Sequence, residues 1–392
     1  MNYLKIIIFN LIGAVLIIAF FHMQLSLAEE NNGLRKIVVF QTIFNESAKD
    51  ELIAKVGGVK LKNLDLIGAK AVWLPDRAAV EKLKLLPGVL RVDDDVIVEA
   101  LQKGSNQSTQ ILPWGIDRID AELVWPLGNT ADSIKVGIID TGISNKHPDL
   151  TLNIRGGYNA INPQKSWNDD NGHGSHVAGI VAALNNTIGV VGVGPQIDLY
   201  AIKVLNANGS GYLSDVIEGI QWAIANGMQV VNMSLGTSQN VQSLHDAVVV
   251  AKNAGVIIVA AAGNSGGSVS YPAAYNEVIA VSAIDKNNQI ASWSSRGPEV
   301  DFAAPGVSIY STYKGTSYAT LSGTSMAAPH VSGAIALVLN TSVGSYDINN
   351  NGKWDPDEIK TKLCDRAVDL GDPGVDNLYG CGLVNAFNSI QP

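Results

Sequence analysis

From residue 134 onward, short apolar segments with strand character alternate with segments of helical spacing, and this alternation restricts the fold more than any other feature of the chain. The strand-like segments are 134–140, 198–205, 228–235, 255–263 and 277–284. They are apolar on both faces, and helical segments such as 213–227 and 241–255 lie between them. Because such strands must be covered on both sides, we predict an α/β fold with a doubly wound, mostly parallel sheet.

Polar side chains stand at the ends of several of these strand-like segments. They are Asp140 after the first segment, Asn232 and Ser234 in the third, and Asn264 after the fourth. In parallel α/β sheets, ligands bind beyond the carboxyl ends of the strands. We therefore predict that the functional site lies at this edge of the sheet.

A different pattern precedes the alternation, in residues 34–101. Its strand-like segments are 34–41, 60–67, 69–75 and 89–100, and its helical segments are 47–57 and 76–88. Ser47 is the expected N-cap of the first helix. The order β-α-β-β-α-β predicts a small ferredoxin-like α+β domain. The polar segment 102–109 that follows has the composition of a linker.

The N-terminal residues predict export. Lys5 precedes an apolar run at 6–21, and the segment 26–28 (SLA) offers a small-x-small cleavage site, so residues 1–28 are predicted to be the signal peptide of a secreted protein. An uncleaved membrane anchor is the alternative, because the apolar run is slightly long for a signal peptide. No later segment is long and apolar enough to span a bilayer, so we expect no stable membrane anchor in the mature form.

Charge and cysteine content bear on partners and on the redox compartment. The formal net charge of −9 and the absence of a Lys/Arg-rich block argue against nucleic acid as a partner. The two cysteines are Cys364 and Cys381. Export would permit a disulfide between them, and two packed thiols are the alternative.

Three short motifs supply the groups that an activated serine requires. Asp140 lies in IIDTG, His173 in NGHGSHVAG and Ser325 in GTSMAAPH, at the start of an apolar helix. A serine hydroxyl needs an adjacent base, and a histidine serves when a buried carboxylate fixes its tautomer. The chain order Asp, His, Ser is one of the known orders of such a triad. The N–H of Ser325 at the helix start and Asn264 in AAAGNSG would be the two donors of an oxyanion hole.

Together these motifs resemble the subtilisin family (subtilases) of serine endopeptidases. The segments DTGI…HPDL, NGHGSHVAGIVAALNNTIGVVGV, NMSLG, AAAGNSG and SGTSMAAPHVSG occur in the family's order, and the resemblance covers roughly residues 34–392. It implies peptide-bond hydrolysis through an acyl-enzyme, with Asp140, His173 and Ser325 as the triad and Asn264 as the oxyanion donor.

A substrate groove is also implied by the resemblance. Segments 233–236 and 261–264 would form its edges, and the backbone of a peptide would pair with them as an added strand. The groove residues implied are Ser234, Leu235, Gly236, Ala262 and Gly263. The glycines and alanines around the groove suggest a broad apolar preference for the substrate residue before the scissile bond.

The resemblance further implies a self-inhibited precursor. Residues 29–101 would be an inhibitory pro-domain, 102–109 a junction, and 110–392 the subtilisin-like catalytic domain. Self-cleavage is expected after Leu101, with Val98 and Leu101 in apolar subsites. Because the junction is longer than usual for the family, the sequence leaves open whether a second trim occurs near Thr109.

A calcium site is implied in the loop that interrupts the helix after His173. The side chains of Gln110, Asp149 and Asn186 and the carbonyls of Leu184, Ile188 and Val190 would bind the ion. Hard oxygen ligands of mixed type suit Ca²⁺. An ordinary Asn-rich loop is the alternative.

A second calcium motif can be identified without the family. Segment 347–358, DINNNGKWDPDE, matches D-x-[DN]-x-[DN]-G-x₅-E, the EF-hand loop. The expected ligands are the side chains of Asp347, Asn349, Asn351, Asp355 and Glu358 and the carbonyl of Lys353. Gly352 would be the turn glycine, whereas Trp354 stands where an aliphatic residue is usual. An Asn/Gly-rich surface turn is the alternative.

Two other function classes compete with this interpretation. An aspartic protease would need a second carboxylate motif to share a proton with Asp140, and the chain has no second D-[ST]-G. A calcium-stabilised binding protein would predict a broken triad.

We expect a monomer that acts on peptides and is inhibited by its own pro-domain. For the remaining polar residues we predict no role in catalysis, with His176 and His330 packed, His147 at the surface, and Asp169 and Asp170 solvated.

Overall fold

The computed structural model describes residues 33–100 and 110–392, so the predicted signal peptide, Leu101 and the predicted junction lie outside the described residues. The chain divides into two compact units, one ending at Asp94 and the other comprising Asp95–Pro392. None of the helices in the described ranges is both long and apolar enough to cross a membrane.

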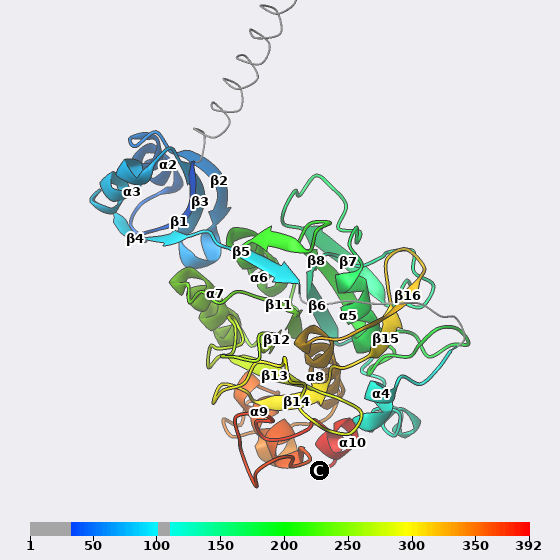
Figure 1. The fold of residues 1–392 in the computed structure, drawn as a ribbon. Coiled ribbons are helices and arrows are strands. Elements are labelled where there is room, and N and C mark those ends of the chain that lie inside the picture. Colours follow the sequence, from blue (N-terminus) through cyan, green and yellow to red (C-terminus); the bar gives the residue numbers. More distant parts are fainter. Residues whose placement is uncertain (1–32, 101–109) are drawn as a thin grey trace, which may run out of the picture. The chain divides into compact units, whose positions relative to one another are not determined.

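The first unit is a four-stranded antiparallel sheet with two helices (Figure 1). Its elements are β1 (Leu34–Phe40), α2 (Glu46–Ala54), β2 (Val59–Leu64), β3 (Ala69–Leu74), α3 (Arg77–Lys84) and β4 (Val89–Asp94), with a short 3₁₀ helix, η1 (Asp65–Ile67). The strand order is β2-β3-β1-β4. This is the predicted element order β-α-β-β-α-β. Val38, Phe40, Leu52 and Leu83 belong to the core between sheet and helices.

Two local predictions in this part of the chain were wrong. The first helix is capped by Asn45, whose side chain accepts the N–H of Ala48, and not by Ser47. The segment 89–100 is not one strand but two, β4 and β5 (Ile97–Ala100). The break falls at Asp95. This residue is nearly buried, and its carboxylate accepts the N–H and the hydroxyl of Ser214. Strand β5 therefore belongs to a sheet of the second unit, although it lies within the predicted pro-domain limits.

A seven-stranded parallel sheet forms the centre of the second unit, in the order β14-β13-β12-β10-β6-β8-β7. Its strands are β6 (Lys135–Asp140), β7 (Ile154–Asn159), β8 (Asp198–Lys203), β10 (Val230–Met233), β12 (Ile257–Ala261), β13 (Val278–Ile284) and β14 (Phe302–Pro305). This confirms the predicted α/β sheet. Strands β7 and β14 were not predicted, because the first contains two glycines and the second is only four residues long.

Helices cover both faces of this sheet (Figure 1). The principal ones are α5 (His173–Ala182), α6 (Leu213–Ala225), α7 (Gln242–Asn253) and α8 (Thr324–Leu339). Helices α5 and α8 pack on each other, as do α6 and α7. On β6, Ile138 lies in the core cluster that contains α5 and α8, whereas the neighbouring Ile139 faces Gly219 of α6. This alternation explains why the strands are apolar on both faces.

Smaller elements complete the second unit. They are α4 (Trp114–Arg118), η2 (Trp125–Leu127), β9 (Ser210–Tyr212), β11 (Leu235–Gly236), the hairpin β15 (Ile309–Thr312) and β16 (Tyr318–Leu321), η3 (Gly344–Tyr346), α9 (Pro356–Arg366) and α10 (Ala386–Ile390). The chain switches sides of the sheet at β6, which has β8 and β10 as neighbours. Ligands bind at such switch points in open α/β sheets.

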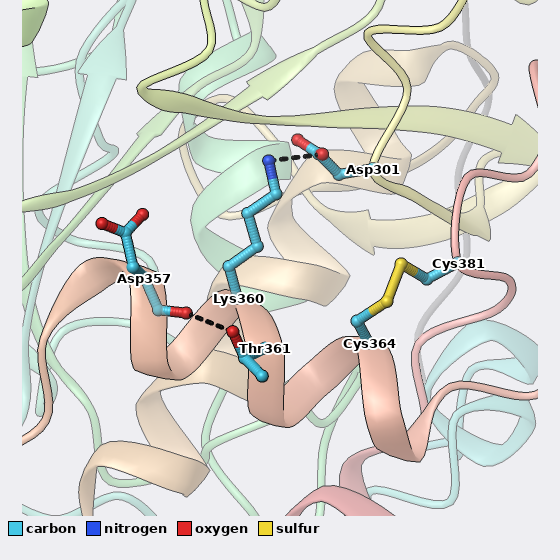
Figure 2. Close-up of a disulfide and its surroundings, with 6 residues drawn as sticks. All are labelled: Asp301, Asp357, Lys360, Thr361, Cys364 and Cys381. Atoms are coloured by element: carbon cyan, nitrogen blue, oxygen red, sulfur yellow. Dashed lines mark hydrogen bonds and ion pairs between the residues drawn. A yellow bond between two sulfur atoms is a disulfide. The ribbon is translucent and has the colours of Figure 1, made fainter. Parts of the chain in front are cut away.

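The two cysteines form a disulfide, which decides between the alternatives left open by the sequence. Cys364 on α9 is joined to Cys381, with the two Cα atoms 5.3 Å apart. Figure 2 shows that Lys360, on the same helix, forms an ion pair of 2.6 Å with Asp301. The N–H of Cys381 donates to the carbonyl of Asp301. Helix α9 is therefore joined to the loop at Cys381 by a covalent bond and to the segment before β14 by an ion pair.

Candidate active site

Asp140 and His173 meet at the carboxyl edge of the sheet. Asp140 ends β6 and His173 begins α5, and Nδ1 of the imidazole lies 2.7 and 2.8 Å from the two carboxylate oxygens. Both side chains are fully buried. Because the carboxylate can only accept, Nδ1 carries the proton and Nε2 is left with a lone pair. In the described part of the chain Nε2 has no hydrogen-bond partner, so it is available as a base.

A glycine allows this close approach of helix and strand. At Gly174, a Cβ atom would lie 2.2 Å from the carbonyl oxygen of Gly142 and 3.1 Å from the Cβ of Asp140. A residue with a side chain would therefore push α5 away from the end of β6 and lengthen the contact between His173 and Asp140. The glycine after His173 in NGHGSHVAG thus has a direct structural role.

The prediction that Asp169 is solvated was wrong. Its side chain is nearly buried, and one carboxylate oxygen accepts the N–H of Gly172 at 2.8 Å while the other accepts the N–H of Ser175 at 2.9 Å. Gly172, the N-cap residue of α5, has no side chain to satisfy these N–H groups. Asp169 also accepts the hydroxyl of Thr141, the neighbour of Asp140. It therefore positions both partners of the Asp140–His173 pair. Asp170, in contrast, has the predicted exposed side chain, paired with Lys203.

Ser325 lies in the first turn of α8 and exchanges two hydrogen bonds with Ser234. The Ser325 hydroxyl donates to the Ser234 carbonyl at 3.0 Å, and the Ser234 hydroxyl donates to the Ser325 carbonyl at 2.8 Å. The second bond has a clear cause. Pro329 stands four residues after Ser325 and has no N–H, so the helix cannot satisfy the Ser325 carbonyl. For proton transfer to His173, the Ser325 hydroxyl must first leave the Ser234 carbonyl.

Asn264 is oriented by Thr324, the residue before Ser325. The carboxamide oxygen of Asn264 accepts the N–H of Thr324 at 3.0 Å and its hydroxyl at 2.9 Å. The Thr324 hydroxyl in turn accepts the N–H of Gly263. With its oxygen held in this way, Asn264 presents its NH₂ group as the atom that donates. The sequence motif indicated Asn264, but it gave no sign that Thr324 sets the orientation.

A three-stranded sheet, in the order β11-β5-β9, forms the candidate substrate groove. Strand β5 is antiparallel to both neighbours. Leu235 pairs with Ala100 and Gly236 with Glu99 on one side, as the prediction for segment 233–236 requires. On the other side β5 pairs with Ser210–Tyr212, which the sequence did not indicate. The chain itself thus supplies the added strand that was expected of a substrate.

The second predicted edge, 261–264, does not pair with β5. The N–H of Ala262 donates to Val281 and its carbonyl accepts from Ser270. The Gly263 carbonyl accepts from Ser295, and its N–H donates to Thr324. Because these backbone groups are already bonded within the protein, this segment can line a groove with small residues but is not an edge that pairs.

The residues predicted for the first calcium site come together around Asp149, which is fully buried. Its carboxylate accepts the Asn186 carboxamide at 2.6 Å and the N–H of Val190 at 2.9 Å. The Gln110 carboxamide donates to the Leu184 carbonyl at 3.2 Å. The N–H of Ile188 donates to the Asn186 carboxamide oxygen. Rotation of the two carboxamides by half a turn would present their oxygens in place of nitrogens.

The prediction that His147 is at the surface was wrong. Its ring is fully buried, and its two nitrogens meet the N–H of Asp149 and the carbonyl of Ser317. Tyr318 contacts the His147 ring edge-on and donates its hydroxyl to Asp149 at 2.9 Å. Both residues therefore hold Asp149 in place. His147 lies only two residues before Asp149, which is the local signal that could have indicated this role.

The EF-hand-like segment folds as a loop between η3 and α9. Gly352 has a φ of 73°, the positive value expected of the turn glycine. The Asp355 carboxylate accepts the carboxamides of Asn349 and Asn351, and the Asp347 carboxylate accepts the N–H groups of Asn351 and Gly352. Glu358 accepts two backbone N–H groups and forms a capping box with Asp355. The element before the loop is a 3₁₀ helix and not the α-helix of a complete EF-hand.

No group of three or more His, Cys, Asp or Glu side chains in residues 33–100 and 110–392 is arranged to hold a metal ion. Both candidate sites instead combine carboxylates with carboxamide and backbone oxygens, which is a donor set that Ca²⁺ accepts.

Two other histidines are structural, as predicted. Nε2 of His176 lies 3.0 Å from the carbonyl oxygens of both Ile309 and Ala319. Burial is the main cause that lowers the pKa of His176 to about 3, and the nearby His173 is the second. Burial lowers the pKa of His330 to about 4. Both rings are therefore neutral near pH 7 and serve packing.

The comparisons with known proteins agree with this geometry. A model of the subtilase family matches residues 131–382. The chain is 50% identical to Subtilisin Savinase of Lederbergia lenta, over 71% of this chain and 98% of that protein. It is 39% identical to Subtilisin J of Geobacillus stearothermophilus, over 95% of each. It is also 40% identical to the Minor extracellular protease Epr of Bacillus subtilis, over 91% of this chain and 55% of that protein.

The chain belongs to the subtilase family and is a subtilisin-like serine endopeptidase that acts on peptides. The aspartic-protease alternative is excluded on the same grounds, and the Asp140 carboxylate meets an imidazole rather than a second carboxylate.

Proposed function

We propose that this protein is a secreted, calcium-dependent endopeptidase that is made as a self-inhibited precursor and processes itself. The observation that carries the proposal is the register of β5. Antiparallel pairing places Ala100 opposite Leu235, so a peptide bound in the same way has its next residue opposite Ser234. Ser234 is the residue that exchanges hydrogen bonds with Ser325. A peptide in the position of β5 therefore leads towards the Ser325 hydroxyl.

In the proposed mechanism, Ser325 is the nucleophile. Its hydroxyl proton moves to Nε2 of His173 as the oxygen bonds to the substrate carbonyl carbon. Asp140 accepts a hydrogen bond from the Nδ1–H throughout and stabilises the imidazolium. The carbonyl oxygen becomes an oxyanion, stabilised by the Asn264 NH₂ group and the Ser325 N–H. His173 then protonates the leaving amine, and water, deprotonated by His173, hydrolyses the acyl-enzyme.

The proposed inhibition uses contacts that an ordinary substrate lacks. Tyr212, the N-cap residue of α6, does not cap the helix with its side chain, and Asp95 supplies a cap by accepting from Ser214. The Val96 carbonyl accepts the N–H of Leu213. These bonds fix the two residues that precede β5, in addition to the strand pairing of β5 itself. We propose that residues 29–101 act as an inhibitory pro-domain, 102–109 as a junction and 110–392 as the catalytic domain, with self-cleavage after Leu101.

Val98 indicates the substrate preference. Its side chain is buried to 1% exposure between β9 and β11, which supports an apolar subsite at this position. The small residues Ala262 and Gly263 support a broad apolar preference at the residue before the scissile bond. Secretion is supported by the predicted signal peptide at 1–28 and by the Cys364–Cys381 disulfide, which is typical of exported proteins.

Calcium fits both candidate sites by the chemistry of their donors. At the first, the buried Asp149 carboxylate accepts from a carboxamide, a backbone N–H and a phenol hydroxyl, all of them uncharged, and the Gln110, Asn186 and backbone oxygens could complete the shell. Bound there, Ca²⁺ would supply charge compensation and rigidity to the 184–190 loop, not chemistry. At the second, the oxygens of Asp347, Asn349, Asn351, Asp355 and Glu358 and the Lys353 carbonyl would bind the ion.

Calcium removal is predicted to lower the unfolding temperature. Ligand bound only to the folded state stabilises it by about 4 kcal/mol when its concentration is 1,000 times Kd. The measurement is the unfolding temperature of the Ser325→Ala protein, which cannot digest itself, with calcium and with EDTA. Asp149→Asn and Asp347→Asn, each introduced into this protein, should each reduce the rise in unfolding temperature that calcium produces. Mg²⁺ is the control ion. Identical unfolding curves with calcium and with EDTA would contradict calcium dependence.

The Asn264→Ala variant is predicted to lose about 10²–10³-fold in kcat with little change in KM, the loss typical of an oxyanion donor. Steady-state kinetics with one peptide substrate measures both constants. The control is Asn240→Ala. Asn240 lies outside the triad, and its carboxamide oxygen accepts the Tyr275 hydroxyl. A loss confined to KM would mean that Asn264 binds substrate rather than the transition state.

The experiment that tests the proposed function is the intact mass of purified wild type and Ser325→Ala, each with and without calcium. Loss of residues 29–101 in wild type alone supports self-processing and locates the cut. A processed Ser325→Ala protein, free of other proteases, would contradict self-processing and favour activation by another protease.

A further inference from the structure

A cavity of about 180 Å³ opens beside the first residue of β5. Its principal lining residues are Ile97, Ile161, Asn206, Tyr212 and Asp215. Ile161 follows β7, and Asn206, Tyr212 and Asp215 lie on the segment that leads through β9 into the first turn of α6, so two separate segments of the catalytic domain enclose it together with β5. Ile97 pairs with Tyr212 in the groove sheet. The cavity therefore lies next to one defined position of the peptide strand.

Ile97 lines this cavity without filling it. Side chains alternate along a strand, and Val98 is buried while the Ile97 side chain is 57% exposed. Ile161 and Tyr212 are 39% and 38% exposed. Three large apolar side chains thus surround open space at one site, and clustered exposed apolar groups mark binding surfaces.

The polar residues of the lining do not change its character. The carboxamide oxygen of Asn206 accepts the N–H of Asn208 at 2.8 Å and of Ser210 at 3.3 Å. The Asp215 side chain is 5% exposed. Asn206 is exposed at the rim, whereas Ile97, Ile161 and Tyr212 supply the apolar walls, and the phenol ring of Tyr212 offers an aromatic face.

We propose that this cavity is a specificity subsite for the substrate residue that pairs with Tyr212, and that it prefers a large aromatic side chain. The inference rests on the proposed function, because it takes β5 as the path of a substrate. A ring larger than isoleucine would fill space that Ile97 leaves open and contact both Ile161 and Tyr212. Since burial of apolar area on a preformed surface is favourable, kcat/KM is expected to be about tenfold higher for Phe than for Gly at this position.

The test uses internally quenched peptides that keep Val-Glu-Ala-Leu and carry Gly, Ile or Phe immediately before it. The measured quantity is kcat/KM for each peptide with the processed wild-type enzyme, Ile161→Ala and Leu152→Ala. Ile161→Ala should reduce the Phe-to-Gly ratio to about twofold, because one wall of the cavity is lost. Leu152 is 69% exposed and does not line the cavity, so Leu152→Ala should keep the wild-type ratio.

The outcomes separate this inference from the proposed function. A ratio of about ten in wild type that collapses in Ile161→Ala supports the subsite. Equal cleavage of all three peptides overturns the subsite and leaves the protease mechanism intact. A high ratio that persists in Ile161→Ala would also overturn it, because the preference would arise elsewhere. Failure of wild type to cleave any peptide would overturn the proposed function and the subsite together.

Discussion

Replacement of Ser325 by alanine is expected to lower kcat by about 10⁶-fold, the loss seen when the nucleophile of a subtilisin is removed. The reason is that no acyl-enzyme can form without the Ser325 hydroxyl. The fold should persist, because this hydroxyl makes one hydrogen bond, to the Ser234 carbonyl, whereas the backbone carbonyl of residue 325 still accepts the Ser234 hydroxyl. The measurement is kcat on a peptide substrate, together with the unfolding temperature of the variant.

The matched control for this prediction is Ser322→Ala. Ser322 lies before α8 and accepts the N–H of Ser308, so its loss should affect kcat by no more than a few-fold. Residual activity of Ser325→Ala within about 100-fold of wild type, after contaminating protease is excluded, would mean that another residue is the nucleophile.

The Asp140→Asn variant is expected to lose about 10⁴-fold in kcat, the loss known for this substitution in a Ser-His-Asp triad. In the native protein both carboxylate oxygens lie within 2.8 Å of Nδ1 of His173. An asparagine NH₂ group at this place would favour the tautomer that carries its proton on Nε2, and Nε2 could then no longer accept the Ser325 proton. The orientation of the ring would be retained while the base was lost.

A control substitution and the value of KM distinguish the loss of the base in Asp140→Asn from damage to the fold. Asp132, an exposed residue before β6, provides the control substitution Asp132→Asn, which should leave kcat unchanged within about twofold. KM should change little in Asp140→Asn, because Asp140 does not lie in the groove sheet. An unchanged kcat would mean that the Asp140–His173 contact plays no part in hydrolysis.

The central sheet could be predicted because its strands are apolar on both faces and are separated by long helices. The same reasoning located Asp140 and Asn264, because a polar residue at the end of a buried parallel strand lies at the edge where ligands bind. The triad as a set followed from motif order and from the family resemblance. Strand β7 was missed because its glycines and polar residues give no apolar alternation, which is common for an edge strand.

What could not be predicted depends on contacts that the sequence does not display, both between near neighbours and between distant segments. Asp169 was expected in solvent, since nothing local shows that Gly172 leaves the N–H groups of α5 to be satisfied from outside. The pairing of β5 with β9 joins residues more than a hundred positions apart. The sequence also did not decide whether Cys364 and Cys381 form a disulfide, because spacing alone does not determine whether two thiols meet.

The two calcium motifs differ in how far the sequence supports them. The 347–358 loop follows from a local pattern of oxygen-bearing residues, and Gly352 has the positive φ that this pattern requires. The ligands around Asp149 are separated by up to 80 positions, from Gln110 to Val190, and only the resemblance indicated them. The supporting roles of His147 and Tyr318 became visible only in the structure.

The most direct test of the account is covalent labelling of the processed enzyme with an organofluorophosphate, followed by peptide mapping. The serine oxygen displaces fluoride from phosphorus, and His173 takes the hydroxyl proton, so labelling requires the same activated nucleophile as peptide hydrolysis. We predict one label per chain, on Ser325, and much slower labelling in Asp140→Asn. A label on a different residue, or an active enzyme that takes up no label, would contradict the assignment of Ser325 as the nucleophile.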